Sequence, residues 1–315
     1  MTLRLLVNPL AKGAYFDAYL DVAMSELRAH VPAVDVEAVS VGGMYFLRLP
    51  LRDDQLSVVS RLSFVQGGFR EAAENTLIPL DLRPDFDLPE GFVYGAKYRG
   101  KTHELVTQLA LNLALLYYRG EDSPRALLDP MAGRGTTLLW GLRYRLQSRG
   151  VEVDPQAREA LHAHLKKQTK LHRVSHTAER GSGGARGRNK DGSFIYFTFG
   201  ERNLRMVTGD AADVSRLLNG QRFELVVADL PYGVEFRQRG ESAMERLQRC
   251  LPAWAESLRP GGTMVLIFNT YQPRRHELDA LMSSAGLFVE SFSAPHRMSE
   301  SIVRDLIVAS RPLSS

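Results

Sequence analysis

The chain has 315 residues, of which 44% are hydrophobic and 24% charged, and its formal net charge at pH 7 is +4. A chain of this size and composition can bury a sizeable core, which excludes global disorder and suits one large domain with a smaller one. The single cysteine, Cys250, excludes an intrachain disulfide and a cysteine-based zinc site.

The apolar stretches are too short for an export signal or a membrane span. Met1–Pro9 is shorter than the core of a signal peptide, and Leu105–Tyr118 is interrupted by polar residues. We therefore expect a cytoplasmic protein of a reducing compartment, with no membrane partner and with Cys250 as a buried, inert thiol. The oligomeric state is left open.

Residues 1–82 predict a small α+β domain, and the proline- and acid-rich segment after them predicts a linker over 83–95. Within the small domain the hydrophobic patterns predict strands at 3–7, 34–40 and 44–49 and helices at 15–29 and 56–65.

From residue 96 to 315 helices and strands alternate, which predicts a parallel α/β sheet with crossover helices. The expected strands are 126–129, 150–153, 204–208, 224–228 and 262–268, with a closing hairpin of 287–292 and 302–309. The expected helices are 103–118, 136–147, 155–167, 242–258 and 273–285.

A Gly-, Arg- and Ser-rich insertion at about 172–193 interrupts this alternation. Between Lys166 and Arg205 basic residues greatly outnumber acidic ones, while the rest of the chain is mildly acidic. A local basic block indicates a polyanionic partner such as nucleic acid, and Arg186, Arg188 and Lys190 are its candidate contacts. A solvated loop is the alternative interpretation.

A glycine-containing turn, Asp-Pro-Met-Ala-Gly-Arg-Gly-Thr-Thr at 129–137, follows a predicted strand and opens a predicted helix. Glycines let the backbone approach a ligand, and the helix N-terminus offers unpaired N–H groups. Leu138 stands where a dinucleotide-binding motif needs glycine or alanine, so that motif is incomplete. The same residues could also form a tight turn that binds no ligand.

Carboxylates follow the next two predicted strands. Glu152 can accept hydrogen bonds from both hydroxyls of a ribose. Asp154 competes for that role, although its position suits a cap of the helix that begins at Pro155. Asp210 is placed to accept from an adenine amino group, or else to cap the helix expected near Val214.

The segment Asp229-Leu230-Pro231-Tyr232-Gly233 follows the strand predicted at 224–228. Methylation of an exocyclic base amine needs acceptors that hold the NH2 group in line with a methyl donor. The Asp229 carboxylate and the Leu230 carbonyl can do this. Pro231 stiffens the turn, and Tyr232 offers a flat face for the base.

The glycine turn, Glu152, Asp210 and the Asp-Leu-Pro-Tyr segment, in this order, resemble class I amino methyltransferases, which bind S-adenosylmethionine. More narrowly, the chain resembles the THUMP-associated guanosine-N2 methyltransferases of tRNA. The similarity covers about 95–310 and includes Lys-Tyr-Arg-Gly-Lys-Thr-His-Glu-Leu at 97–105. It implies a Rossmann-like methyltransferase domain behind a ferredoxin-like, THUMP-related one.

The resemblance also implies roles for individual residues. Asp229 and Tyr232 match the catalytic pair of the family. The expected cofactor contacts are Asp129, Met131, Gly133, Gly135, Thr136 and Ala211, with Lys101 and Thr102 near the methionine carboxylate of the cofactor. Met131 and Arg134 depart from the family pattern, the first 90 residues are short for its N-terminal region, and the basic insertion is not one of its features.

We therefore expect direct, metal-free methyl transfer to guanosine N2 in an RNA, with tRNA as the first candidate. The nearest rival function is a DNA methyltransferase acting on adenine N6 or cytosine N4, but only about 80 residues follow Tyr232, which leaves no room for a large target-recognition domain. The sequence is also compatible with a small-molecule methyltransferase or a non-catalytic RNA-binding protein.

Overall fold

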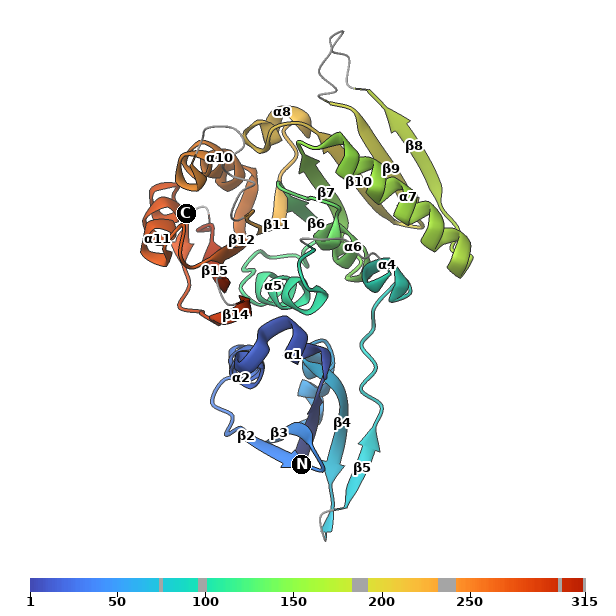
Figure 1. Cartoon of the computed structure of the whole chain (residues 1–315), viewed down its shortest axis with the longest axis vertical. Helices are drawn as coiled ribbons and strands as arrows, with labels where there is room; N and C mark the ends of the chain where they lie inside the picture. The colour runs from blue at the N-terminus through green and yellow to red at the C-terminus, as the bar shows by residue number, and fades with distance from the viewer. Residues whose placement is uncertain (74–75, 96–100, 183–191, 232–241, 300–301, 314–315) are drawn as a thin grey trace. The chain divides into compact units, whose positions relative to one another are not determined.

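The computed structural model describes residues 1–73, 76–95, 101–182, 192–231, 242–299 and 302–313. The chain divides into two compact units (Figure 1). The N-terminal unit comprises Met1–Asp85 with Phe292–Leu306, and the C-terminal unit comprises Phe86–Ser291 with Ile307–Ser315. The sequence pattern predicts that all residues after 95 belong to the larger domain, so the grouping of 292–306 with the smaller one corrects that boundary.

The N-terminal unit is a ferredoxin-like α+β fold, as predicted. Its antiparallel sheet has the order β2-β3-β1-β4-β5, in which β5 extends the usual four strands. Its elements are β1 (Thr2–Val7), α1 (Leu10–Tyr15), η1 (Phe16–Ala18), α2 (Tyr19–His30), β2 (Glu37–Val41), β3 (Met44–Pro50), η2 (Asp53–Gln55), α3 (Leu56–Val59), β4 (Val65–Glu71), β5 (Leu77–Leu80) and, from the C-terminal segment, β14 (His296–Ser299).

The helix predicted at 56–65 is wrong beyond its first turn, because α3 ends at Val59. The backbone N–H and the hydroxyl of Ser63 both donate to the buried carboxylate of Glu26, at 3.0 and 2.5 Å. The Ser63 amide is therefore engaged away from the helix ladder. Sequence analysis missed β4 and β5, whose glycines and proline weaken the strand pattern.

The C-terminal unit contains the alternating helices and strands. Its elements are α4 (Gly91–Tyr94), α5 (Glu104–Leu116), β6 (Ala126–Asp129), α6 (Thr136–Arg143), β7 (Gln147–Glu152), α7 (Pro155–His172), β8 (Thr177–Gly181), β9 (Phe194–Phe199), β10 (Arg202–Thr208), η4 (Ala211–Asp213), α8 (Val214–Leu217), β11 (Phe223–Asp229), α10 (Ala243–Ser257), β12 (Leu258–Asn269), α11 (Arg275–Ser284), β13 (Phe288–Val289) and β15 (Ile302–Ser310), whose second half lies in this unit.

The predicted Rossmann-like α/β sheet is confirmed. The strand order is β13-β15-β12-β11-β6-β7-β10-β9-β8, and β10, β7, β6, β11 and β12 pair in parallel. The closing hairpin is also present, because β13 pairs antiparallel with β15. All four residues of β6 are buried, as expected for a parallel strand covered by helices on both faces.

The region from 155 to 199 differs from the prediction. The helix α7 continues to His172, five residues beyond its expected end. The segment 172–193, predicted as an irregular insertion, contains β8, and β9 follows it. Antiparallel pairing of β8 with β9, and of β9 with β10, extends the edge of the sheet. The polar sequence of β8 carries little strand signal of its own.

Part of the predicted linker belongs to the C-terminal unit. The Phe86 ring packs on the rings of Trp140 and Tyr144, at centroid distances of 5.5 and 4.9 Å. Phe92 and Val93, in α4, are fully buried. Residues from 86 onward therefore contribute to the core of this unit.

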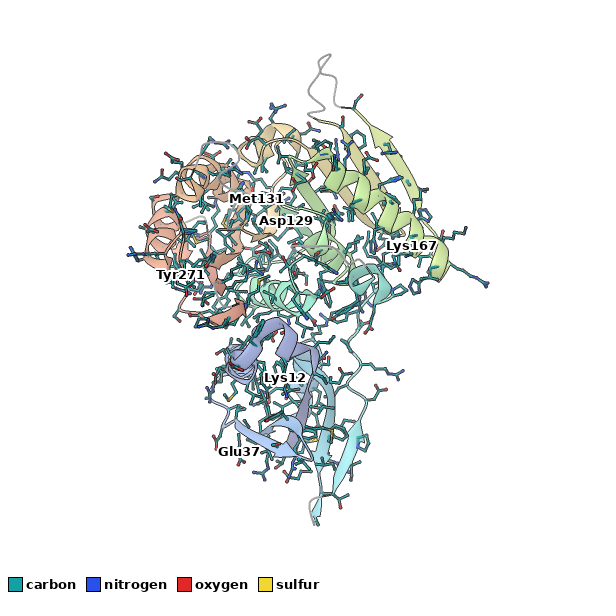
Figure 2. All side chains as sticks on the ribbon, in the orientation of Figure 1. Lys12, Glu37, Asp129, Met131, Lys167 and Tyr271 are labelled. Atoms are coloured by element: carbon teal, nitrogen blue, oxygen red, sulfur yellow. The ribbon has the colours of Figure 1, made fainter. Side chains whose placement is uncertain are left out.

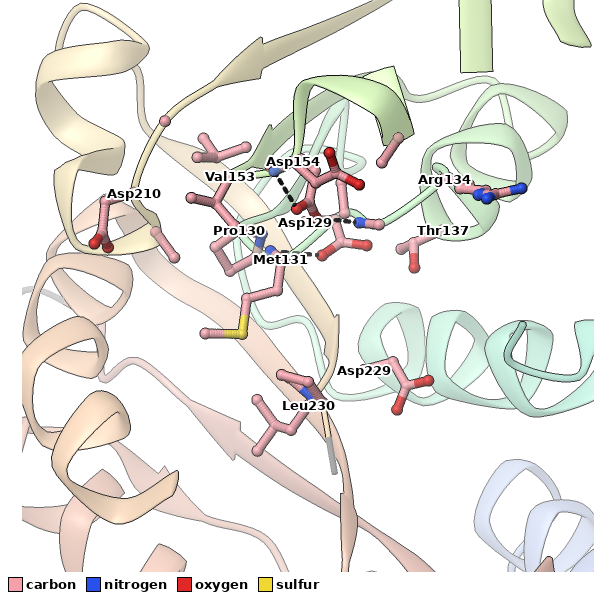
Figure 3. A pocket seen from close by; sticks show the side chains of 18 of the residues that line it. Asp129, Pro130, Met131, Arg134, Thr137, Val153, Asp154, Asp210, Asp229 and Leu230 are labelled. Atoms are coloured by element: carbon pink, nitrogen blue, oxygen red, sulfur yellow. Dashed lines mark hydrogen bonds between the residues drawn. The ribbon is translucent and has the colours of Figure 1, made fainter. Parts of the chain in front are cut away.

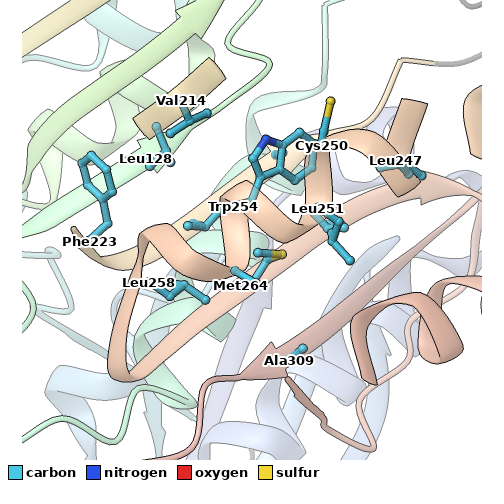
Figure 4. Close-up of a cluster of buried hydrophobic side chains, with 14 of the residues drawn as sticks. Leu128, Val214, Phe223, Leu247, Cys250, Leu251, Trp254, Leu258, Met264 and Ala309 are labelled. Carbon is cyan, nitrogen blue, oxygen red and sulfur yellow. The ribbon is translucent and has the colours of Figure 1, made fainter. Parts of the chain in front are cut away.

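The helix α10 closes one side of the sheet with a stripe of apolar residues. Leu247, Cys250, Leu251 and Trp254 are each 0% exposed and pack in one buried cluster (Figure 4). Cys250 is thus a buried thiol, as predicted. The Trp254 indole N–H donates to the Ala211 carbonyl at 2.9 Å, which connects this core to η4, the short helix after β10.

We predict that Trp254→Ala lowers the free energy of unfolding by about 3–5 kcal/mol, because it leaves a large cavity in this cluster. Urea denaturation measures the change. Leu171→Ala is the matched control, since Leu171 is 66% exposed. A loss of less than about 1 kcal/mol for Trp254→Ala would contradict the packing described here.

Candidate functional site

The carboxyl ends of β6, β7, β10 and β11 meet at one edge of the C-terminal unit's sheet, around a pocket of about 550 Å³ (Figure 3). This is the edge at which open α/β sheets bind ligands. The pocket is lined by most of the predicted site residues: Thr102, Asp129, Met131, Gly133, Thr136, Glu152, Asp210, Ala211, Asp229, Leu230 and Pro231.

The glycine turn between β6 and α6 contains two backbone conformations that residues with a side chain rarely adopt. Gly133 and Gly135 have φ values of +50° and +82°. A Cβ at Gly135 would lie 2.7 Å from Leu161, so this glycine allows α6 and α7 to approach each other. A Cβ at Gly133 would meet no protein atom within 4 Å, since that position borders the pocket. Of the two, only Gly133 lines the pocket.

Glu152, at the end of β7, holds the glycine turn. Its Oε2 accepts from the Gly133 N–H at 2.8 Å, and its Oε1 accepts from the Asp154 N–H at 2.8 Å. Burial raises the pKa of Glu152, while these backbone hydrogen bonds oppose the shift. A backbone hydrogen bond from Val153 opposes it too, so the two oxygens together keep at most one further acceptor position for a ligand hydroxyl. Asp154 caps α7 by accepting from the Gln156 N–H at 2.9 Å, as anticipated.

Asp129, at the end of β6, is a buried carboxyl at the floor of the pocket, only 3% exposed. Its Oδ1 accepts from the Met131 N–H at 3.0 Å. Burial is the main cause that raises its pKa from 3.8 to about 7, and the charges of Asp229 and Glu152 add to the rise. Hydrogen bonds from Thr137 and Met131 oppose it.

Asp210 lies on the opposite side of Met131 from Asp229 (Figure 3). Its Oδ1 accepts from the Ala212 N–H at 2.9 Å, so it caps η4, and it forms an ion pair with Arg249 at 3.0 Å. Asp210 therefore caps η4 and not the helix expected near Val214, whose N-cap residue is Asp213, and it also borders the pocket.

Two arginines of α10, Arg246 and Arg249, line the pocket and were missed by sequence analysis. They lie one helical turn apart on a helix whose apolar stripe is the only pattern visible in the sequence. Nothing local distinguishes them from other surface arginines.

Asp229 is the last residue of β11 and lines the pocket. The Thr102 hydroxyl donates to Asp229 Oδ2, which fixes the orientation of the carboxylate. The Leu230 N–H donates to the Ile267 carbonyl at 2.9 Å, so β12 holds this turn in place. Tyr232 lies outside the described residues, as do Arg186, Arg188 and Lys190.

Lys101 does not line the pocket. Its ammonium donates to the Val93 carbonyl at 2.9 Å and pairs with Glu104 at the start of α5. Among the residues that the structure describes, no three His, Cys, Asp or Glu side chains are grouped as a metal site. No helix within the described residues is long and apolar enough to cross a membrane.

No family model and no curated protein sequence matches the chain. Among solved structures it is similar to a methyltransferase from Pyrococcus furiosus, with a TM-score of 0.44 and 13% identity over 71% of this chain and 92% of that one. It is also similar to precorrin-6y C5,15-methyltransferase from Geobacter metallireducens, with a TM-score of 0.42 and 15% identity over 69% and 93%. A third is magnesium protoporphyrin IX methyltransferase from Synechocystis, with a TM-score of 0.41 and 12% identity over 70% and 88%.

The raised pKa of Asp129 predicts a pH-dependent stability. Between about pH 4 and pH 7 the folded protein keeps a proton that the unfolded chain has lost, so the free energy of unfolding falls as pH rises through this window. We expect Asp129→Asn to reduce the fall between pH 5 and pH 7.5 by about 2–3 kcal/mol. Urea denaturation at both pH values measures it. Asp213→Asn, at an exposed site, is the control, and parallel changes in wild type and Asp129→Asn would contradict the assignment.

Proposed function

We propose that the protein is an S-adenosylmethionine-dependent methyltransferase whose cofactor occupies the pocket at the carboxyl edge of the sheet. The observation that carries the proposal is the convergence of Asp129, Glu152, Asp210 and Asp229, from four different strand ends, around the turn at Gly133. When bound, S-adenosylmethionine supplies an electrophilic methyl group on a positively charged sulfonium.

The residues of the pocket fit this cofactor. Glu152 keeps an acceptor position for a ribose hydroxyl, and Asp210 stands at the next strand end, where an adenine amino group would need an acceptor. The carboxyl of Asp129 suits the positively charged methionine portion. A volume of about 550 Å³ lies within the range of cofactor sites.

A nicotinamide or flavin dinucleotide fits less well. Leu138, on α6, is 0% exposed, and one of its methyl carbons lies 2.6 Å from where a Cβ of Gly150 would stand. A bulky side chain therefore fills the space between α6 and β7, where dinucleotide-binding folds place a small residue for close packing. The pyrophosphate would also lie in a pocket edge lined by carboxylates.

We assign the chemistry at the acceptor amine to Asp229. Its carboxylate accepts an N–H of the amine and orients the nitrogen lone pair for direct in-line attack, without a covalent enzyme intermediate. As the N–C bond forms, positive charge develops on the nitrogen, and the carboxylate stabilises it and receives the proton afterwards. Thr102 acts as a positioning residue through its hydrogen bond to Asp229.

We further propose guanosine N2 in an RNA, with tRNA as the first candidate, as the acceptor. In support, Gly181 of β8 pairs with Phe194 of β9, and the Gly192 N–H donates to the Thr208 carbonyl at 2.8 Å. The chain thus leaves and re-enters the sheet beside Gly209, which lines the pocket. Arg186, Arg188 and Lys190 lie outside the described residues, and we assign them as contacts with RNA phosphates on their charge and sequence position.

We predict that Asp229→Ala reduces methyl transfer by at least about 100-fold, because the amine loses its orienting acceptor. The assay follows labelled methyl groups from S-adenosylmethionine into total tRNA, ribosomal RNA and genomic DNA, and identifies the product nucleoside by mass. Cofactor binding should persist in this variant, because Asp129, Glu152 and Asp210 remain in the pocket. Asp213→Ala, an exposed carboxylate outside the pocket, is the matched control.

N2-methylguanosine in RNA, lost in Asp229→Ala and kept in Asp213→Ala, is the expected result. Label found only in DNA would keep the cofactor site and replace the acceptor by adenine N6 or cytosine N4. Label in neither polymer would contradict the proposed acceptor and would direct the search to small amines.

Cofactor binding has a separate test at Glu152. Removal of a hydrogen bond to a charged group costs about 1.5–3 kcal/mol, so Glu152→Gln should raise the dissociation constant of S-adenosylmethionine about 10- to 100-fold. Isothermal titration calorimetry measures it. Glu159→Gln is the matched control, since Glu159 lies outside the pocket on α7. Equal affinities of the two variants for S-adenosylmethionine would show that Glu152 does not bind the cofactor.

A further inference from the structure

The two faces of the sheet formed by β8, β9 and β10 carry different kinds of side chains. Ile195, Phe197 and Phe199 of β9 are at most 3% exposed. Phe197 lies under α7, with the His162 ring at 5.5 Å and the Lys166 ammonium at 6.0 Å from its ring centre. Figures 1 and 2 show α7, with Lys167, along these strands. This face is covered.

The alternate residues of β9, Phe194, Tyr196 and Thr198, point to the other face and are only half-buried. Phe194 borders the buried cluster that includes Val207 and Trp254. Tyr196 and Thr198 are the next residues of this row along β9, away from the carboxyl edge of the sheet.

Strand register places two arginines beside Tyr196. Tyr196 pairs with Arg205 of β10, and Arg205 pairs with Arg149 of β7. Directly paired residues share a face of the sheet, so the three side chains form one row. In the adjacent row Thr198 pairs with Asn203. We call these five residues, Arg149, Tyr196, Thr198, Asn203 and Arg205, the β9–β10 surface.

The arginines of this surface are held in place by neutral groups. Arg149 donates to Asn203 at 2.6 Å and to Gln221 at 3.1 Å, both through side-chain amide oxygens. The Arg205 guanidinium lies 4.5 Å from the Phe194 ring centre, and its Nε is buried without a hydrogen-bond partner among the described residues. Carboxylates are absent from these interactions, so the positive charge is not neutralised by them.

Glu179 of β8 is the acidic residue paired with Tyr196, and it is exposed. Beside this one carboxylate, the surface has two guanidinium groups, one tyrosine ring and neutral hydrogen-bonding side chains on a sheet. Guanidinium groups bind phosphates, aromatic rings stack on bases, and amides and hydroxyls bond to base edges and ribose. An apolar protein partner would find little hydrophobic area here.

We propose that the β9–β10 surface binds an unpaired strand of the RNA substrate, with a base stacked on Tyr196 and a phosphate on Arg205. The inference deepens the proposed function, because it assumes an RNA acceptor. Toward the carboxyl end of β10 the same face is covered at Val207 by the buried cluster that includes Trp254, and the pocket residues Gly209 and Asp210 follow in the chain.

The test measures binding of fluorescently labelled bulk tRNA by anisotropy at several salt concentrations. Tyr196→Ala should raise the dissociation constant about 5- to 150-fold, from a stacking energy of about 1–3 kcal/mol per base, whereas Tyr196→Phe keeps the ring and should bind like wild type. Arg205→Gln should lower the slope of log affinity against log salt by about 0.7–0.9, the contribution of one phosphate contact.

Arg125→Gln is the matched control, since Arg125 is exposed at the opposite, amino edge of β6. Unchanged cofactor binding in each variant establishes that it is folded. Wild-type affinity and slope in Tyr196→Ala and Arg205→Gln would overturn the proposal, as would no tRNA binding by the wild type. So would a dimer that Arg205→Gln dissociates, because the surface would then be an interface between copies. Binding without methyl transfer would contradict the proposed function alone.

Discussion

The hydrogen bonds of one half-buried carboxylate, Glu152, join the parts from which the pocket is built. One oxygen binds the Gly133 N–H in the turn after β6, and the other binds the Asp154 N–H at the start of α7. The turn needs Gly133 and Gly135 because both have positive φ. The conformation of this turn therefore depends on the acceptor atoms of Glu152. The packing of α6 against α7 depends in turn on Gly135.

Parallel strands impose a second constraint, because their carboxyl ends bring Asp129, Glu152, Asp210 and Asp229 to one edge. Burial raises the pKa of Asp129 to about 7, and the charges of Asp229 and Glu152 add to the rise. Such an edge disfavours an anionic ligand and favours a cationic one. A sulfonium cofactor would match this negative charge, and Arg246 and Arg249 from α10 also line the pocket.

The sequence predicted the parts of this site that follow local rules. A buried strand, a glycine turn and a helix placed Asp129, Gly133 and Glu152 correctly in the fold, and the Asp-Leu-Pro segment placed Asp229 at the end of β11. Arg246 and Arg249 could not be foreseen, because only the orientation of α10 brings them to the pocket. Likewise β8 becomes a strand only through pairing with β9, and the return of 292–306 to the N-terminal unit is a long-range contact with no local signal.

The central claim is that the carboxylate edge binds S-adenosylmethionine, and calorimetric titration of the cofactor at pH 6 and pH 8 tests it most directly. Because Asp129 must lose its proton to attract a cation, the affinity should be roughly tenfold higher at pH 8 in the wild type and nearly independent of pH in Asp129→Asn. No binding at either pH, or the same pH dependence in both proteins, would contradict the account.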